Sequence, residues 1–142
     1  MLDTNPVKIE IAPIGVVESS LTDAGSAPRQ PDEGAPPATL VFNAEVGEGL
    51  QGVQPGDSIY VLTWLDRARR DLLTVHPRGD RTRPREGVFN TRAPHRPNPI
   101  GLHRTTVTAV EGLRVRVANL EALNGTPIVD VKPMLNEDVG QR

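Results

Sequence analysis

The sequence predicts a single all-β domain, a small β-barrel of short strands joined by proline-rich loops. Three observations support this prediction. Short segments rich in Val, Ile, Leu and Thr recur at close spacing, which is typical of barrels and sandwiches. The 14 prolines and 13 glycines leave room only for short helical turns. The 142 residues suffice for one hydrophobic core, so residues 1–142 are expected to form one domain.

The expected strands are runs of β-branched and apolar residues bounded by Gly, Pro, Asn or Asp. Two of them form a predicted hairpin around Glu111-Gly112, because the sequence from Arg114 to Val117 alternates with a period of two. In chain order, extended segments are expected at residues 7–19, 39–44, 58–65, 72–76, 87–91, 102–110, 113–119 and 128–132. Tyr60 and Trp64 alternate along one of these strands and are expected in the core.

The segments between the strands are expected to be loops and short turns. Residues 21–38 are rich in Pro, Gly, Ala and Asp, and residues 77–86 form a charged loop. Short helical turns are expected at residues 46–52 and 66–71. The tail, residues 136–142, is expected to be flexible.

One glycine-rich segment imitates a dinucleotide-binding loop. Residues 47–52 spell Gly-Glu-Gly-Leu-Gln-Gly. That loop needs a helix at its third glycine, whose backbone N–H groups would bind the phosphates. Pro55 and Gly56 break any such helix almost at once. We therefore interpret the segment as a turn packed on the barrel.

The composition excludes several classes of site. The chain has no cysteine, which excludes disulfides and thiolate chemistry and fits a cytoplasmic location. We expect neither a signal peptide nor a membrane span, because no stretch approaches about 18 apolar residues. His76, His95 and His103 show no metal-ligand spacing, so no metal site is expected.

The net charge of −2 hides an uneven distribution of charge. Residues 1–66 hold ten acids and two bases, whereas residues 67–104 hold ten arginines and three acids. Arginine binds phosphate and carboxylate groups bidentately, so the block favours an anionic partner. A solvated charged loop explains the composition equally well.

The densest signal lies in residues 87–102. Pro94, Pro97 and Pro99 fix the backbone there, so the loop is rigid and displays its polar side chains. A rigid loop costs less entropy to order around a ligand, which favours a binding site over a purely structural crossover. The displayed side chains are those of Arg92, His95, Arg96 and Asn98.

This loop resembles the signature of the TsaA-like (TrmO-type) S-adenosylmethionine-dependent methyltransferases, in which a G-V-F-A-T-R segment leads into R-P-N-P-I-G. Other blocks resemble the same family in the same order. They are residues 11–19, the Pro-Arg-Gln at 28–30, the strand that ends at Arg67, and the closing Asn-Gly-Thr-Pro-Ile-Val-Asp-Val-Lys-Pro at 124–133. The sequence departs from the usual family residues at Asp66, Asn90, Asn124 and Met134.

The resemblance implies a β-barrel that dimerises and binds S-adenosylmethionine near the subunit interface. It also implies methylation of N6 of N6-threonylcarbamoyladenosine next to the anticodon of tRNA. The implied cofactor contacts are Arg29, Gln30, Asp66, Arg67, Arg92, Leu102, Ala118, Asn119, Leu120 and Glu121. Arg96, Asn98 and Lys132 are expected to face the substrate.

Residue chemistry suggests roles within that site. Arg29 or Arg92 could pair with the cofactor carboxylate, Glu121 could accept hydrogen bonds from the ribose, and the backbone of residues 118–120 could bind the adenine edge. The acceptor nitrogen must lose a proton, and Asp130 and His95 are the candidate general bases. A charge pair with Lys132 or a turn cap is a slightly simpler role for Asp130.

Several alternatives stay open at this stage. His95 also fits an ordinary surface loop histidine, and His76 and His103 are interpreted as incidental. The function could be methylation of a small-molecule acceptor instead of tRNA. It could also be non-catalytic binding or sensing of S-adenosylmethionine.

Overall fold

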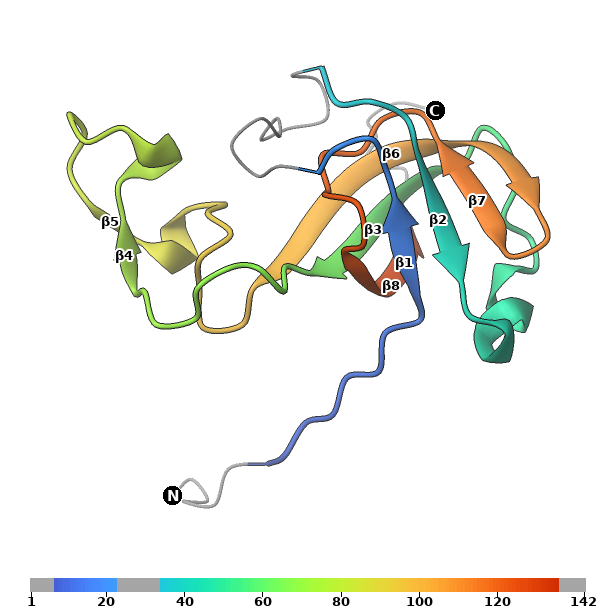
Figure 1. Ribbon diagram of the computed structural model, residues 1–142, viewed down its shortest axis with the longest axis horizontal. Helices are drawn as coiled ribbons and strands as arrows, with labels where there is room; N and C mark the ends of the chain where they lie inside the picture. Colours follow the sequence, from blue (N-terminus) through green and yellow to red (C-terminus); the bar gives the residue numbers. More distant parts are fainter. Residues whose placement is uncertain (1–6, 23–33, 136–142) are drawn as a thin grey trace.

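A computed structural model describes residues 7–22 and 34–135 (Figure 1). Arg29, Gln30 and the tail at 136–142 lie outside the described residues. The strands are β1 (Gly15–Glu18), β2 (Ala38–Phe42), β3 (Ser58–Trp64), β4 (Thr74–Val75), β5 (Glu86–Gly87), β6 (Ile100–Glu111), β7 (Arg114–Val117) and β8 (Pro127–Pro133). The helical turns are all of the 3-10 type: η3 (Ala44–Leu50), η4 (Pro77–Gly79) and η5 (Val88–Asn90). The predicted all-β class is therefore confirmed.

Six strands form a barrel-like ring in the order β1-β2-β7-β6-β3-β8, and every neighbouring pair is antiparallel. The pairing is uneven. β3 pairs along its whole length with β6, whereas the seam between β1 and β8 holds only the pairs Gly15–Ile128 and Val16–Pro127. The ring therefore closes through its shortest contact.

Alternating side chains fill the ring. Along β3 the buried positions are Ile59, Val61 and Thr63, because successive residues of a strand point to opposite faces. Apolar side chains of the other strands extend the core, with Val17, Leu40, Val107, Val115, Val117 and Ile128 almost fully buried. The expectation that Tyr60 and Trp64 lie in the core is wrong, since both occupy the half-buried outer face of β3.

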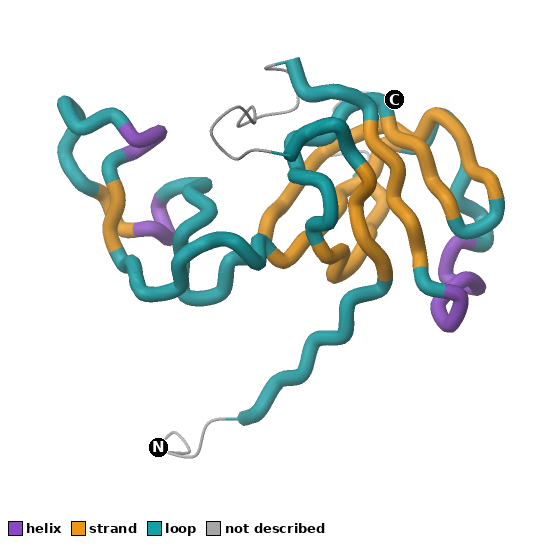
Figure 2. The backbone as a smooth tube through the Cα atoms, viewed as in Figure 1, coloured by secondary structure: helices purple, strands orange, loops and turns teal. Residues whose placement is uncertain are grey.

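Residues 66–99 leave the ring as an extension that contains β4, β5, η4 and η5, on the left of Figure 1. Its two short strands form a sheet of their own. Figure 2 shows that most of this extension is loop, with the strands of the ring gathered on the other side. The arginine block of the sequence thus forms a separate protrusion beside the ring.

Several expected elements differ from the observed ones. Residues 7–14 form no strand, and Val7 and Ile9 are 84% and 79% exposed. Residues 66–71 form turns instead of a helix, because the backbone of Arg69 bonds to His95 and Arg96. Residues 87–91 turn into η5 straight after β5. The other predicted strands are confirmed with shifted ends.

The glycine-rich segment 47–52 is a turn, as predicted. It contains most of η3, and residues 53–57 that follow it are not helical. Val46 and Leu50 pack against the core, and a side chain at Gly47 would meet Leu113 of the β6–β7 turn at 3.0 Å. This packing leaves no helix N-terminus for phosphates. In the described part of the chain, no helix is long and apolar enough to cross a membrane.

Candidate functional site

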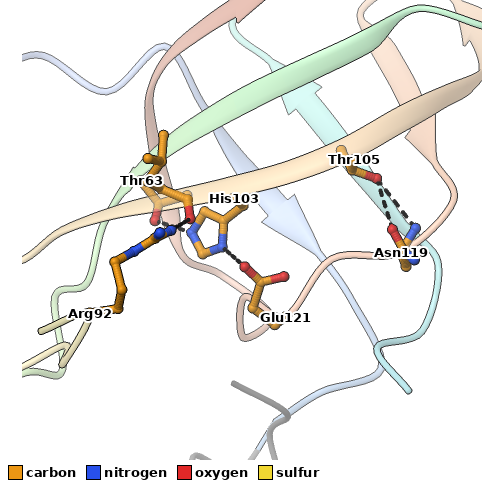
Figure 3. Close-up of polar contacts among 7 residues, drawn as sticks. Thr63, Arg92, His103, Thr105, Asn119 and Glu121 are labelled. Carbon is orange, nitrogen blue, oxygen red and sulfur yellow. Dashed lines mark hydrogen bonds and ion pairs between the residues drawn. The ribbon is translucent and has the colours of Figure 1, made fainter. Parts of the chain in front are cut away.

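A line of buried polar side chains lies inside the ring. Thr63 of β3 and His103 of β6 face inward, and Glu121 follows β7 (Figure 3). Thr63 Oγ1 lies 2.7 Å from His103 Nε2, and His103 Nδ1 lies 2.6 Å from Glu121 Oε1. The side chains of His103 and Glu121 are only 6% and 10% exposed. Buried polar groups are costly unless they are paired, so this line is a specific feature of the core.

The donor and acceptor in each of these hydrogen bonds follow from the chemistry of the imidazole and the carboxylate. A carboxylate only accepts, so His103 Nδ1 carries the proton that is donated to Glu121. In the neutral imidazole Nε2 then accepts the hydroxyl proton of Thr63. Glu121 Oε2 is also buried, and it has no partner within the described part of the chain. One oxygen of this carboxylate is held and the other is free to accept a hydrogen bond.

Gly101 leaves room for this line. It pairs with Thr63 across the β3–β6 ladder and lies on the same face of β6 as His103. A Cβ at this position would collide with Thr63 Oγ1 and would lie 2.7 Å from His103 Nε2. The glycine of the proline-rich signature is therefore required by the close approach of two polar side chains.

Residues 118–121 run beside β6. The Ala118 amide donates to the Thr106 carbonyl at 2.9 Å, and the Asn119 amide lies 3.4 Å from Thr105 Oγ1. The Leu120 amide donates to the Pro36 carbonyl, and Leu120 is fully buried. The predicted cofactor segment is thus an ordered strip that ends at Glu121.

Arg92 connects the extension to this part of the ring. Its guanidinium donates to the Leu102 carbonyl at 3.1 Å, next to His103 in the chain (Figure 3). Arg92 is exposed, and the Leu102 side chain is 42% exposed on the outer face of β6. The contact brings together two predicted cofactor residues that are ten positions apart in the sequence.

Asp66 and Arg67 lie where the extension begins. Both side chains are exposed, and the Arg67 guanidinium lies 3.4 Å from the Thr22 carbonyl and 3.5 Å from the Asn124 carbonyl. These long contacts orient Arg67 towards the segment that follows Glu121. Asp66 makes a backbone bond to Trp64, and the structure gives no reason for its carboxylate.

The two candidate bases occupy different surroundings. His95 Nδ1 accepts the backbone N–H of Arg69 at 2.9 Å, so the neutral ring carries its proton on Nε2 and has no lone pair to spare. Asp130 Oδ2 lies 3.4 Å from Lys132 Nζ, the charge pair considered above, and its side chain is 48% exposed. Asp130 Oδ1 also accepts the Val131 N–H at 2.9 Å, but each carboxylate oxygen keeps a second lone pair, which favours Asp130 over His95 as a base.

The strand register relates Asp130 to Leu102. Both residues pair with Leu62, from β8 and β6 respectively, so all three share the outer face of the ring. Their backbones are therefore roughly 10 Å apart, two strand spacings. Lys132 lies on the same outer face, opposite Tyr60.

Arg96 and Asn98 are held within the extension. The Arg96 guanidinium donates to the carbonyls of Val88, Thr91 and Ala93 at 2.7 to 3.2 Å. Asn98 Oδ1 accepts from Arg70, whose guanidinium lies 5.2 Å from the ring centre of Trp64. These contacts stabilise the proline-rich loop, and the predicted substrate roles of Arg96 and Asn98 stay predictions.

Internal ion pairs and hydrogen bonds engage several arginines of residues 67–104. Arg69 and Asp71 form a bidentate pair, and the hydrogen bond from Arg69 lowers the pKa of the Asp71 carboxyl below its usual value. Arg85 donates to Thr74 at 3.0 and 3.1 Å. The side chain of Arg81 makes no polar contact in the described residues, which leaves it available for an anion.

Sequence reasoning missed the roles of His103 and Thr63. His103 was interpreted as incidental, whereas it is 5% exposed and joins two elements. The available signal was the alternation along residues 101–107, which places Gly101, His103, Thr105 and Val107 on one face. Within residues 7–22 and 34–135, no group of three or more ligating side chains could hold a metal ion.

The chain matches a known family over nearly its whole length. A profile of the tRNA-methyltransferase O N-terminal domain matches residues 16–138. The chain belongs to this family. Its fold is also similar to the crystal structure of TrmO from Pseudomonas aeruginosa, with a TM-score of 0.76, 29% identity and 95% of this chain covered.

Relatives in archaea are similar in sequence. A protein of Archaeoglobus fulgidus named an S-adenosyl-L-methionine-binding protein is 42% identical over 86% of this chain and 86% of its own length. A second protein of that organism, named a probable S-adenosyl-L-methionine-binding protein, is 38% identical over 88% of this chain. The chain spans 34% of the length of that second relative and 58% of the TrmO chain.

Proposed function

We propose that this chain binds S-adenosylmethionine and transfers its methyl group to N6 of N6-threonylcarbamoyladenosine beside the anticodon of tRNA. The observation that carries the proposal is that Arg92 and Glu121 contact adjacent residues in the first half of β6, Arg92 at the Leu102 carbonyl and Glu121 at the His103 ring. Family membership and the archaeal relatives named for S-adenosylmethionine binding support the cofactor. The name of the family supports tRNA as the substrate.

The chemistry of the described residues fits the cofactor. S-adenosylmethionine offers a carboxylate, a ribose diol and an adenine, and it would find an exposed guanidinium on Arg92, a free acceptor on Glu121 and an ordered backbone at residues 118–120. A second guanidinium, that of Arg67, lies 3.5 Å from the Asn124 carbonyl in the segment that follows Glu121. When bound, the cofactor supplies an electrophilic methyl group.

The chain's own residues would then position the acceptor and remove its proton. Alignment of nucleophile and methyl group can supply several kcal/mol of the barrier reduction, roughly 7 or more in well-oriented cases. We assign proton removal to Asp130, because His95 is occupied by the Arg69 amide. Lys132 would hold the Asp130 carboxylate in place.

The extension offers a surface for the tRNA backbone. Arg81 and Arg83 are exposed on the loop between η4 and β5. Phosphate contacts of this kind supply affinity that falls with salt concentration. We further propose that the chain acts as a homodimer in the cytoplasm, as the family resemblance implies.

Calorimetry with S-adenosylmethionine tests the cofactor proposal. We expect Arg92→Ala to weaken binding by at least about tenfold, because an ion pair to the carboxylate would be lost. Arg116→Ala is the matched control, since Arg116 lies exposed on β7 and away from Arg92. Equal affinity of wild type and Arg92→Ala would remove Arg92 from the site.

A second candidate function is binding without catalysis. The names of the archaeal relatives, which mention S-adenosyl-L-methionine binding and no reaction, favour it. Measurable cofactor binding without methyl transfer to any tRNA would support this alternative, or methylation of a small molecule.

A further inference from the structure

The unequal surroundings of the two Glu121 oxygens suggest a more specific role, which rests on the proposed function. Oε1 is fixed by His103 at 2.6 Å, whereas Oε2 is buried without a partner in the described residues. An unpaired buried carboxylate oxygen costs free energy, so natural proteins seldom leave one without a ligand or water. The Glu121 side chain is nine-tenths buried, so few solvent molecules can compensate.

We propose that Thr63 and His103 are positioning residues that hold Glu121 so that its Oε2 accepts a hydrogen bond from the ribose diol of the cofactor. The Thr63 hydroxyl on β3 orients the His103 imidazole on β6, and the imidazole in turn orients the Glu121 carboxylate after β7. The proton on Nδ1 is kept there because Nε2 is occupied by the Thr63 hydroxyl. A wrong tautomer would point a lone pair at the carboxylate and release it.

The Thr63–His103–Glu121 arrangement resembles the hydroxyl, imidazole and carboxylate of a hydrolase catalytic triad. The burial of Thr63 excludes a nucleophilic role for its hydroxyl. Thr63 is 0% exposed, so no substrate can reach its hydroxyl without opening the ring. Glu121 is the least buried end of the line, with 10% of its side chain exposed, and its Oε2 has no partner in the described residues. The ligand group that this oxygen would meet is therefore one that donates a hydrogen bond.

The neighbouring residues identify which donor it meets. Glu121 directly follows residues 118–120, which we propose lie beside the adenine, although the amides of Ala118 and Leu120 already donate to the carbonyls of Thr106 and Pro36. The ribose is attached to the adenine, so the residue that follows in the strip would meet the diol. The ammonium group of the cofactor lies with its carboxylate, which we assign to the guanidinium of Arg92. An acidic side chain on a ribose hydroxyl is a recurrent way of binding nucleosides.

Two substitutions of His103 separate its two contacts. His103→Asn keeps an amide donor near the Nδ1 position and can still hold Glu121, whereas His103→Gln places its amide near the Nε2 position and loses Glu121. We expect His103→Gln to weaken binding of S-adenosylhomocysteine about tenfold or more in calorimetry, and His103→Asn to retain most of the affinity. Thr63→Ser should bind as wild type does and Thr63→Val more weakly. The reverse order in either pair would overturn the positioning role.

Ribose analogues give a readout that a purely structural role would not change. Wild type should bind S-adenosylhomocysteine about tenfold or more tightly than its 2′-deoxy or its 3′-deoxy form. His103→Gln should lose that discrimination, with all three ligands bound equally weakly. If wild type binds all three forms equally, the inference fails while cofactor binding stands. If wild type binds none of them and no S-adenosylmethionine, the proposed function fails as well.

Discussion

Gly101 and its neighbours illustrate how single residues shape the site. The inward face of β6 carries a glycine, a histidine and a threonine ahead of Val107, where an ordinary barrel strand would carry large apolar side chains. Gly101 leaves space beside Thr63, and the His103 imidazole occupies that space with a hydrogen bond to Thr63. A substitution at Gly101 is therefore expected to affect both the stability of the protein and the proposed cofactor site.

We predict that Gly101→Ala destabilises the protein by about 1–3 kcal/mol, because the added methyl group overpacks the contact between Thr63 and His103. Urea unfolding measures the change. Gly49→Ala is the control, since a Cβ there meets nothing within 4 Å and the backbone is not left-handed. Equal stability of the two variants would show that the interior line tolerates displacement.

The pKa of Asp71 provides a second test at this scale. The hydrogen bond from Arg69 lowers it, so the pair contributes most above the unfolded pKa of the carboxyl and is lost as the pH falls through the folded pKa. We predict that Arg69→Gln raises the Asp71 pKa towards its usual value, as followed by NMR titration. The pKa of Asp80, lowered mainly by the Thr82 hydroxyl, should not move. An unchanged Asp71 pKa would contradict the observed pairing.

At the residue scale, the sequence predicted Arg92 and Leu102 as site residues but did not predict His103. The convergence of Arg92 and Leu102 followed from the family resemblance, and the structure brings the two together. His103 was missed because alternation identifies two faces of a strand but does not say which one is the interior when both carry polar residues.

The elements divide into a regular ring and an irregular extension. The long strands β3 and β6 were predicted because they are runs of β-branched and apolar residues bounded by turn residues. The ends of shorter elements depend on tertiary contacts that no local pattern reveals. Residues 66–71 illustrate this. The Arg69 backbone forms hydrogen bonds with His95 and Arg96 of the proline-rich loop, so it is not available for helical hydrogen bonds.

The Arg96 side chain makes three hydrogen bonds to the backbone of the proline-rich loop. We predict that Arg96→Ala speeds hydrogen exchange of the amides in residues 88–93, because three backbone carbonyls lose their donor. Arg81→Ala, in the same extension, should leave exchange unchanged. Equal exchange in the two variants would mean that the three prolines alone hold the loop.

At the scale of the whole molecule, most of the arginines lie in the extension beside the ring. The acidic N-terminal half contributes β1, β2 and β3, whereas the arginines gather in the extension at 66–99. A partner such as tRNA would therefore be attracted to the side of the molecule that also carries Arg92. The composition suited an anionic partner and a solvated charged loop equally, and it could not reveal that Arg69, Arg70, Arg85 and Arg96 are engaged in internal contacts.

We predict that tRNA binding weakens steeply with salt, and that Arg81→Ala and Arg83→Ala each reduce the slope of the logarithmic plot by about one. Fluorescence titration at several salt concentrations measures the slope. Arg114→Gln is the control, because Arg114 is paired with Glu18 on the ring. A slope that is the same in all variants would remove the extension from the tRNA interface.

The most direct test of the proposed methyl transfer is to follow labelled methyl from S-adenosylmethionine to tRNA with and without the threonylcarbamoyl modification. We expect label on the modified tRNA only, and strongly reduced label with Arg92→Ala and Asp130→Asn. Absence of label on both tRNAs, with cofactor binding intact, would contradict methylation of threonylcarbamoyladenosine.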